Sequence, residues 1–112
     1  MGLEAVVEKE ARKHLEKRGG MMLKFVSPGY NGPPDRICFH INCTAFLIEF
    51  KAPGKSLRPE QRKACTEMAA AGARIYAGPD FEGIRTIKDA IEIIDDEIDN
   101  RVPRRHPIVS GL

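Results

Sequence analysis

The chain has 112 residues, of which 42% are hydrophobic and 30% are charged, and its formal net charge is +2. This length predicts one globular domain with a single core and leaves no room for a second unit. No apolar run approaches the roughly 18 residues that cross a bilayer. The first turns carry Glu4, Glu8 and Glu10, which is unlike a signal peptide. We therefore expect a cytoplasmic protein with no membrane partner.

The charges are segregated along the chain. Residues 51–88 hold eight basic and four acidic groups, whereas residues 89–100 hold six acidic groups and no basic one. Basic groups attract a phosphate backbone, so the middle of the chain is the part expected to face a partner. A solvated mixed surface would have a similar composition.

The first half of the chain predicts one helix followed by three strands. The predicted elements are a helix over residues 3–18, a strand over 21–26, a loop over 27–34, and strands over 36–41 and 44–50. Gly19 and Gly20 end the helix. The loop is rich in Pro and Gly, and a tight turn near Asn42 joins the last two strands.

The second half predicts helix, strand, helix. Pro59 is suited to the first turn of a helix that runs to about Ala71, and residues 74–77 suggest a last short strand. Thr86 and Asp89 form a capping-box start for a helix over 86–99. Its predicted apolar face consists of Ile87, Ile91, Ile94 and Ile98.

The resulting order, α-β-β-β-α-β-α, predicts an α/β fold in which helices flank a mixed central sheet. We expect this domain to span residues 1–100. Residues 101–112 contain two prolines and three arginines. They are expected to form a basic tail that orders only against a partner.

Residues 48–51, Ile-Glu-Phe-Lys, are the most informative stretch. On a strand, Glu49 and Lys51 would project from one face while Phe46, Ile48 and Phe50 pack on the other. An apolar strand tolerates such charges only when each is compensated by the other, by a divalent cation or by an anionic substrate. The pattern points to metal-assisted phosphodiester chemistry.

The order of elements, together with Pro34–Asp35, Glu49–Phe50–Lys51 and Gln61, resembles the PD-(D/E)xK, restriction-endonuclease-like nucleases. It is most similar to their VRR-NUC branch in its stand-alone phage or bacterial form. Features of that branch that recur here are a Glu in the first helix, Gly-Pro-Pro-Asp-Arg, Leu-Ile-Glu-Phe-Lys-Ala-Pro-Gly-Lys, Leu-Arg-Pro-Glu-Gln, and Gly-Ala ahead of the last strand. The likeness covers about residues 3–80. Pro33 departs from it, because the family more often has an apolar residue there.

The resemblance implies Mg²⁺ or Mn²⁺ held by Asp35, Glu49 and the backbone carbonyl of Phe50, an oxygen-rich set that hard cations prefer. A helical acid completes the set. Spacing to the glycines after the helix and the helical wheel both favour Glu4, with Glu8 in reserve.

Two further residues are expected in catalysis. Lys51 would orient the attacking water or contact the scissile phosphate, and a salt bridge to Glu49 is compatible with either role. Gln61 would hydrogen-bond the water or the carboxylates; the alternative is an exposed helical glutamine. Basic residues expected to follow the DNA phosphates, or simply to form a solvated helix face, are Lys55, Arg58, Arg62 and Lys63.

These observations predict a metal-dependent DNA endonuclease in a bacterial or phage-infected cell. The resemblance implies a structure-selective enzyme that cuts four-way (Holliday) junctions as a homodimer, whose twofold axis supplies two active sites. The alternatives are a nuclease module of a larger replication or restriction complex and a non-catalytic DNA-binding subunit. Ile93, off the apolar face of its helix, and the acidic run beside the basic tail suggest a dimer interface in the C-terminal region. The alternatives are that these charges pair within one chain or that the tail contacts DNA.

Overall fold

The computed structural model describes residues 2–101 and 105–111. Its elements are α1 (Leu3–Lys17), β1 (Met21–Lys24), β2 (Arg36–His40), β3 (Cys43–Ile48), α2 (Pro59–Ala70), β4 (Ile75–Tyr76) and α3 (Ile87–Ile98). The predicted order of elements and the α/β class are therefore confirmed. Within the described ranges, no helix is both long enough and apolar enough to cross a membrane.

The four strands form one mixed sheet in the order β1-β2-β3-β4. β1 pairs antiparallel with β2 and β2 antiparallel with β3, with Ile37 opposite Leu47. β4 runs parallel to β3, which is possible because α2 carries the chain back across the sheet. β3 is thus a central strand whose carboxyl end is flanked by neighbours on both sides.

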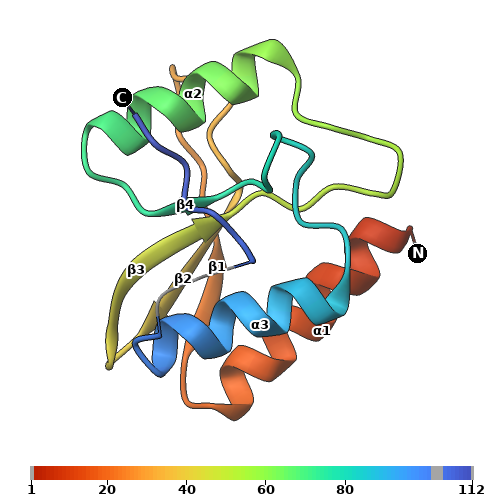
Figure 1. The fold of residues 1–112 in the computed structure, drawn as a ribbon, viewed down its shortest axis with the longest axis vertical. Coiled ribbons are helices and arrows are strands. Elements are labelled where there is room, and N and C mark those ends of the chain that lie inside the picture. Colours follow the sequence, from red (N-terminus) through yellow and green to blue (C-terminus); the bar gives the residue numbers. More distant parts are fainter. Residues whose placement is uncertain (1, 102–104, 112) are drawn as a thin grey trace.

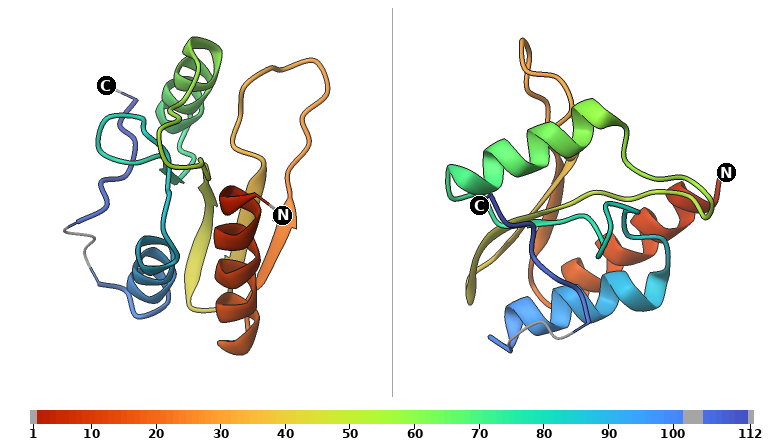
Figure 2. Two further views of the ribbon diagram at one scale, coloured as in Figure 1. Left: turned by 90° about the vertical axis from the view of Figure 1, so that its right-hand side faces the viewer. Right: turned by 45° about the horizontal axis from the view of Figure 1, so that its top comes forward.

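Helices cover both faces of this sheet. α1 and α3 lie side by side on one face, and α2 lies on the other (Figures 1 and 2). Two apolar clusters follow from this layering. The first packs α1 and α3 against Phe46, Ile48 and Phe50, and the second packs α2 against Leu47 and Ile75. This is the alternation along β3 that its sequence predicted.

Local sequence features explain which residues α1 buries and where α3 begins. In α1, the buried Val7, Ala11 and Leu15 recur every fourth residue, the spacing of one helical face. α3 begins where the hydroxyl of Thr86 accepts a hydrogen bond of 3.0 Å from the backbone N–H of Asp89.

One expectation about α3 is wrong. Ile93 has no exposed surface and belongs to the core, whereas Ile87, assigned to the buried face, is 37% exposed. The buried face of α3 is therefore rotated about the helix axis relative to the predicted face. It includes Ile93 and leaves Ile87 partly exposed. Ile93 offers no second surface, so it no longer supports a dimer interface.

The described part of the C-terminal segment lies against the domain. Ile108 forms an antiparallel bridge with Tyr76, and the N–H of Val109 donates to the Ile75 carbonyl at 2.9 Å. Gly111 approaches Ala70 so closely that a Cβ at position 111 would lie 2.2 Å from the Ala70 nitrogen. Residues 105–111 thus have a place within the single chain, which the composition of the tail did not predict; residues 102–104 and 112 lie outside the described residues.

Candidate active site at the end of β3

Glu49 follows directly after β3 and is buried, with 5% of its surface exposed. Its backbone is fixed on one side: the N–H donates to the Tyr76 carbonyl at 3.0 Å, and the carbonyl accepts from the Ile84 N–H at 2.8 Å. The side-chain oxygen Oε2 is buried and has no hydrogen-bond partner among the described residues. Buried carboxylate oxygens are normally hydrogen-bonded, so this oxygen is available to a ligand.

Several charges surround this carboxylate. Burial raises the pKa of Glu49 from its ordinary 4.5 to about 7. The ammonium of Lys51, 3.9 Å from Oε1, opposes this shift. The negative charges of Asp35 and Glu4 raise the pKa further, and Arg58 lowers it. Four charged side chains therefore lie close enough to Glu49 to affect its pKa: Glu4, Asp35, Lys51 and Arg58.

Asp35 follows the fully buried Pro34 and stands just before β2. Its carbonyl accepts a hydrogen bond of 2.8 Å from the N–H of Phe25, which fixes its backbone at the mouth of the long loop. The side chain is 56% exposed, and its nearest cation is Arg36 at 3.6 Å. An exposed carboxylate with a fixed backbone is available to a ligand.

The two helical acids have different surroundings. Glu8 forms a close ion pair with Arg36, with 2.6 Å between Oε1 and Nη2. Glu4 is exposed in the first turn of α1, and its charge acts on Glu49. This geometry favours Glu4 as the acid facing the candidate site and gives Glu8 a structural partner.

Gln61 is buried at 8% exposure in the first turn of α2. Its side-chain oxygen accepts a hydrogen bond of 2.9 Å from the backbone N–H of Arg58, so it caps the helix. The spacing of three residues at a helix start was the signal for this role, which the sequence analysis did not use.

The four basic residues expected at the DNA all lie exposed around α2 and the preceding loop. Arg58 pairs with Glu60 at 3.3 Å, and the Arg62 guanidinium lies over the Phe81 ring at 5.2 Å. Of the four, Arg58 is the one whose charge acts on Glu49.

The oxygen donors at this site fit a hard divalent cation. Asp35, Glu49 and Glu4 supply carboxylates, and none of the backbone hydrogen bonds found in the described chain uses the carbonyl oxygen of Phe50. Such sets are typical of Mg²⁺ and Mn²⁺ sites. The unpartnered Oε2 of Glu49 is the observation that supports the fit.

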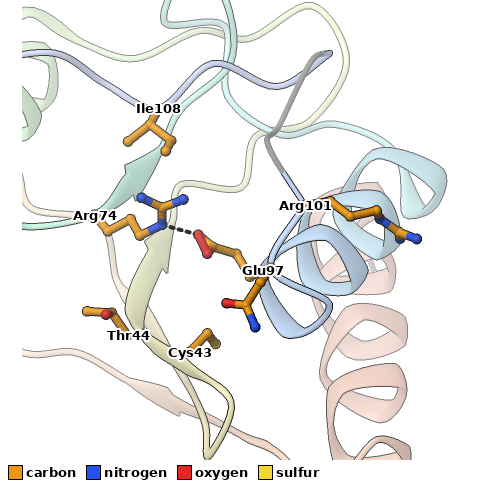
Figure 3. Close-up of a pocket in the computed structure, with 7 residues that line it drawn as sticks. Cys43, Thr44, Arg74, Glu97, Arg101 and Ile108 are labelled. Carbon is orange, nitrogen blue, oxygen red and sulfur yellow. Dashed lines mark hydrogen bonds and ion pairs between the residues drawn. The ribbon is translucent and has the colours of Figure 1, made fainter.

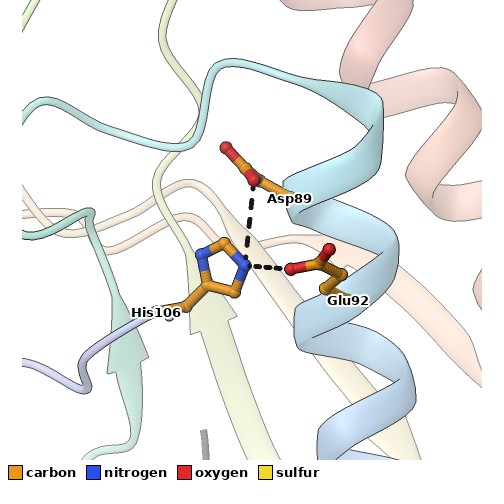
Figure 4. A group of neighbouring side chains, drawn as sticks. All are labelled: Asp89, Glu92 and His106. Atoms are coloured by element: carbon orange, nitrogen blue, oxygen red, sulfur yellow. Dashed lines mark hydrogen bonds and ion pairs between the residues drawn. The ribbon is translucent and has the colours of Figure 1, made fainter. Parts of the chain in front are cut away.

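A second group of possible metal ligands lies away from this site. The ligand atoms of Asp89, Glu92 and His106 lie within 4.8 Å of one another (Figure 4). Nε2 of the buried His106 lies 2.9 Å from Glu92, and this hydrogen bond lowers the pKa of Glu92. The group fastens the C-terminal segment to α3. The sequence analysis did not find it because the chain has to turn back after α3 to bring His106 beside Glu92, 14 residues earlier.

A pocket of about 450 Å³ opens at the other end of β3, beside Cys43 and Thr44 (Figure 3). Glu97 is buried there, accepting hydrogen bonds from Arg74 and, at 2.8 Å, from the Tyr76 hydroxyl. The carboxylate of Glu97 is thus engaged within the fold, in contrast to that of Glu49.

The fold and the site together define a small α/β domain of restriction-endonuclease-like element order, with a buried carboxylate and a lysine after its central strand. No protein-family model matches the chain. The chain is 36% identical over 72 residues to "Putative nuclease p44" of Acyrthosiphon pisum secondary endosymbiont phage 1. The match covers 64% of this chain and 77% of that protein. The chain belongs to the family of this phage nuclease.

Proposed function

We propose that the protein is a metal-dependent DNA endonuclease of the VRR-NUC branch of the PD-(D/E)xK nucleases, selective for branched DNA such as the four-way junction. The observation that carries the proposal is the buried Glu49, whose Oε2 has no hydrogen-bond partner among the described residues. The negative charges of Asp35 and Glu4 repel its carboxylate and raise its pKa. A fold holds like charges around an unpartnered carboxylate at a cost in stability, which a bound cation offsets.

In this proposal Asp35, Glu49, the Phe50 carbonyl and Glu4 hold Mg²⁺ or Mn²⁺. The bound cation supplies positive charge that stabilises the phosphate transition state and makes a water more acidic. Lys51 lies on the same side of the strand as Glu49, and its ammonium orients the attacking water or contacts the scissile phosphate. Gln61 donates from its amide nitrogen while its oxygen stays on the α2 cap.

The exposed basic residues of α2 and of the loop before it support DNA as the substrate. They would neutralise backbone phosphates, and the charge of Arg58 acts on Glu49; the four are Lys55, Arg58, Arg62 and Lys63. Binding of this kind weakens as the salt concentration rises. A homodimer would present two such surfaces and two sites, which symmetric cutting of a junction requires.

The test is cleavage of a matched set of labelled substrates: four-way junction, flap, single strand and linear duplex, each with Mg²⁺, Mn²⁺ or chelator. We expect metal-dependent cleavage of the junction at the lowest protein concentration. Equal cleavage of linear duplex would overturn the junction selectivity, and cleavage in chelator would overturn the metal dependence.

The two alternatives give other patterns in the same assay. A nuclease module of a larger complex would cut weakly and without preference until its partners are added. A non-catalytic DNA-binding subunit would bind the substrates and leave all of them intact. The unpartnered carboxylate disfavours the second alternative, because a subunit without catalysis has no use for it.

A further inference from the structure

The residues that follow β3 are hydrogen-bonded to a loop more than 30 positions further along the chain. Residues 78–85, here called the support loop, connect β4 to α3 and return beside Glu49 and Lys51. Ile84 donates to the Glu49 carbonyl at 2.8 Å and accepts from the Lys51 N–H at 3.1 Å. Since β4 ends at Tyr76, the support loop is the neighbour that fixes the backbone of Lys51.

Gly83 brings the support loop against the Lys51 side chain. An added Cβ at position 83 would lie 2.4 Å from Cγ and 2.6 Å from Cβ of Lys51, closer than such atoms can approach. The aliphatic part of Lys51 therefore lies directly on the Gly83 backbone. Gly83 also has φ +82, a conformation that glycine adopts without strain.

The same loop also holds the segment between Lys51 and α2. Arg85 donates from its guanidinium to the carbonyl of Lys55 and, at 3.1 Å, to that of Glu82. The carbonyl of Phe81 accepts from the N–H of Leu57 at 2.9 Å. These contacts tie Lys55 and Leu57 to the support loop.

We propose that the support loop is a positioning element for the Lys51 ammonium, with Gly83 setting where the side chain lies and Arg85 holding the loop in place. This inference rests on the proposed nuclease function, and it assigns to Gly83 and Arg85 an effect on the chemical step rather than on folding alone. Neither residue touches the reacting atoms, so both are positioning residues.

The test is Gly83→Ala beside Gly29→Ala, a matched control. Gly29 has the same φ of +82, but a Cβ there would meet nothing within 4 Å. Both variants therefore carry the backbone strain of alanine at positive φ, and only Gly83→Ala displaces Lys51. We expect Gly83→Ala to lower kcat about 10- to 100-fold, because small misplacements of a catalytic group have effects of this size.

Two readouts separate positioning from loss of structure. In Gly83→Ala, the affinity for Mg²⁺ should stay within about twofold of the wild type, since an ammonium group is no metal ligand. In a Lys51→Gly background, which lacks both side-chain atoms that the added Cβ would meet, Gly83→Ala should cause no further loss of rate. A loss equal to that of Gly29→Ala, or a further loss in the Lys51→Gly background, would overturn the proposal.

Arg85→Gln is a second test of the positioning role, for use if Gly83→Ala does not fold. It should lower kcat by about threefold or more while the Kd for junction DNA in chelator stays within about twofold. A raised Kd with unchanged kcat would make Arg85 a DNA contact and overturn its positioning role. If the wild type does not cleave at all, the proposed function is wrong. If the wild type cleaves and kcat is unchanged in both variants, only the positioning role of the support loop is wrong.

Discussion

At the scale of single residues, the carboxylate of Glu49 is the group whose environment is least explained by folding. Burial raises its pKa to about 7, and Oε2 has no hydrogen-bond partner in the described chain. The apolar sequence around Glu49 predicted the burial. Sequence could not rank Glu4 and Glu8 by their partners, because the ion pair between Glu8 and Arg36 joins α1 to β2 across 28 positions of the chain.

Lys51→Ala tests the division of labour between the lysine and the acids. The variant should lose roughly 100-fold or more in cleavage rate, as expected when a group that assists proton transfer or charge stabilisation is removed. Calorimetric titration with Mn²⁺ should still give binding, because Lys51 supplies no ligand. Loss of metal binding together with activity would contradict this assignment.

The shifted pKa of Glu49 predicts how stability varies with pH when no metal is present. A folded pKa of about 7 against an ordinary 4.5 means that the folded state holds this proton more tightly. The stabilisation is complete below pH 4.5 and is lost as the pH rises through about 7, by up to about 3 kcal/mol.

Urea unfolding in chelator, at pH 5 and pH 8, measures this effect. The difference in unfolding free energy between the wild type and Glu49→Gln should shift in favour of the variant by up to about 3 kcal/mol on going from pH 5 to pH 8. A difference that does not change with pH would mean that Glu49 is not held in this environment.

At the scale of elements, the order and type of all seven followed from the sequence, since periodic apolar positions and Pro or Gly boundaries are strong local signals. The burial of Ile93 did not follow. A helical wheel places residues relative to one another, but which sector faces the sheet depends on packing with α1 and on the Phe46 side of β3. The capping role of Gln61 was readable from its spacing to the helix start but was not predicted, and its expected role at the site stays a prediction.

Ile93→Ala checks this correction to α3. Because Ile93 is fully buried, the substitution should lower the unfolding free energy by about 2–5 kcal/mol. Ile87→Ala on the same helix is the control, since Ile87 is 37% exposed, and it should cost less than about 1 kcal/mol. Chemical unfolding of the two variants decides; equal losses would contradict the burial of Ile93.

At the scale of the whole molecule, the acidic residues of α3 form ion pairs with the basic residues that follow it in the same chain. Arg101 pairs with Asp96 at 3.0 Å, and Arg105 lies 3.5 Å from Glu92, so the acidic run and the tail need no second copy to pair. The sequence left pairing within the chain and pairing across a twofold axis open, because charge patterns do not fix which molecule supplies the partner. The proposed dimer therefore depends on the need for two active sites.

Light scattering on the intact chain and on a truncation after Asn100 tests the assembly. We expect a dimeric mass for the intact protein at micromolar concentration. A monomeric mass would contradict the dimer, and a dimer that persists after truncation would exclude the tail from the interface. The truncation removes the buried His106, so its thermal unfolding should be measured as well.

In the proposed function, a divalent cation held by Asp35 and Glu49 makes this protein a nuclease. The most direct measurement compares Asp35→Asn and Glu49→Gln with the wild type on labelled junction DNA in Mg²⁺ and Mn²⁺. Each variant deletes one negative ligand without a change of size, so cleavage should fall roughly 100-fold or more while DNA binding persists. Near-normal cleavage by either folded variant at matched metal concentration would contradict the account.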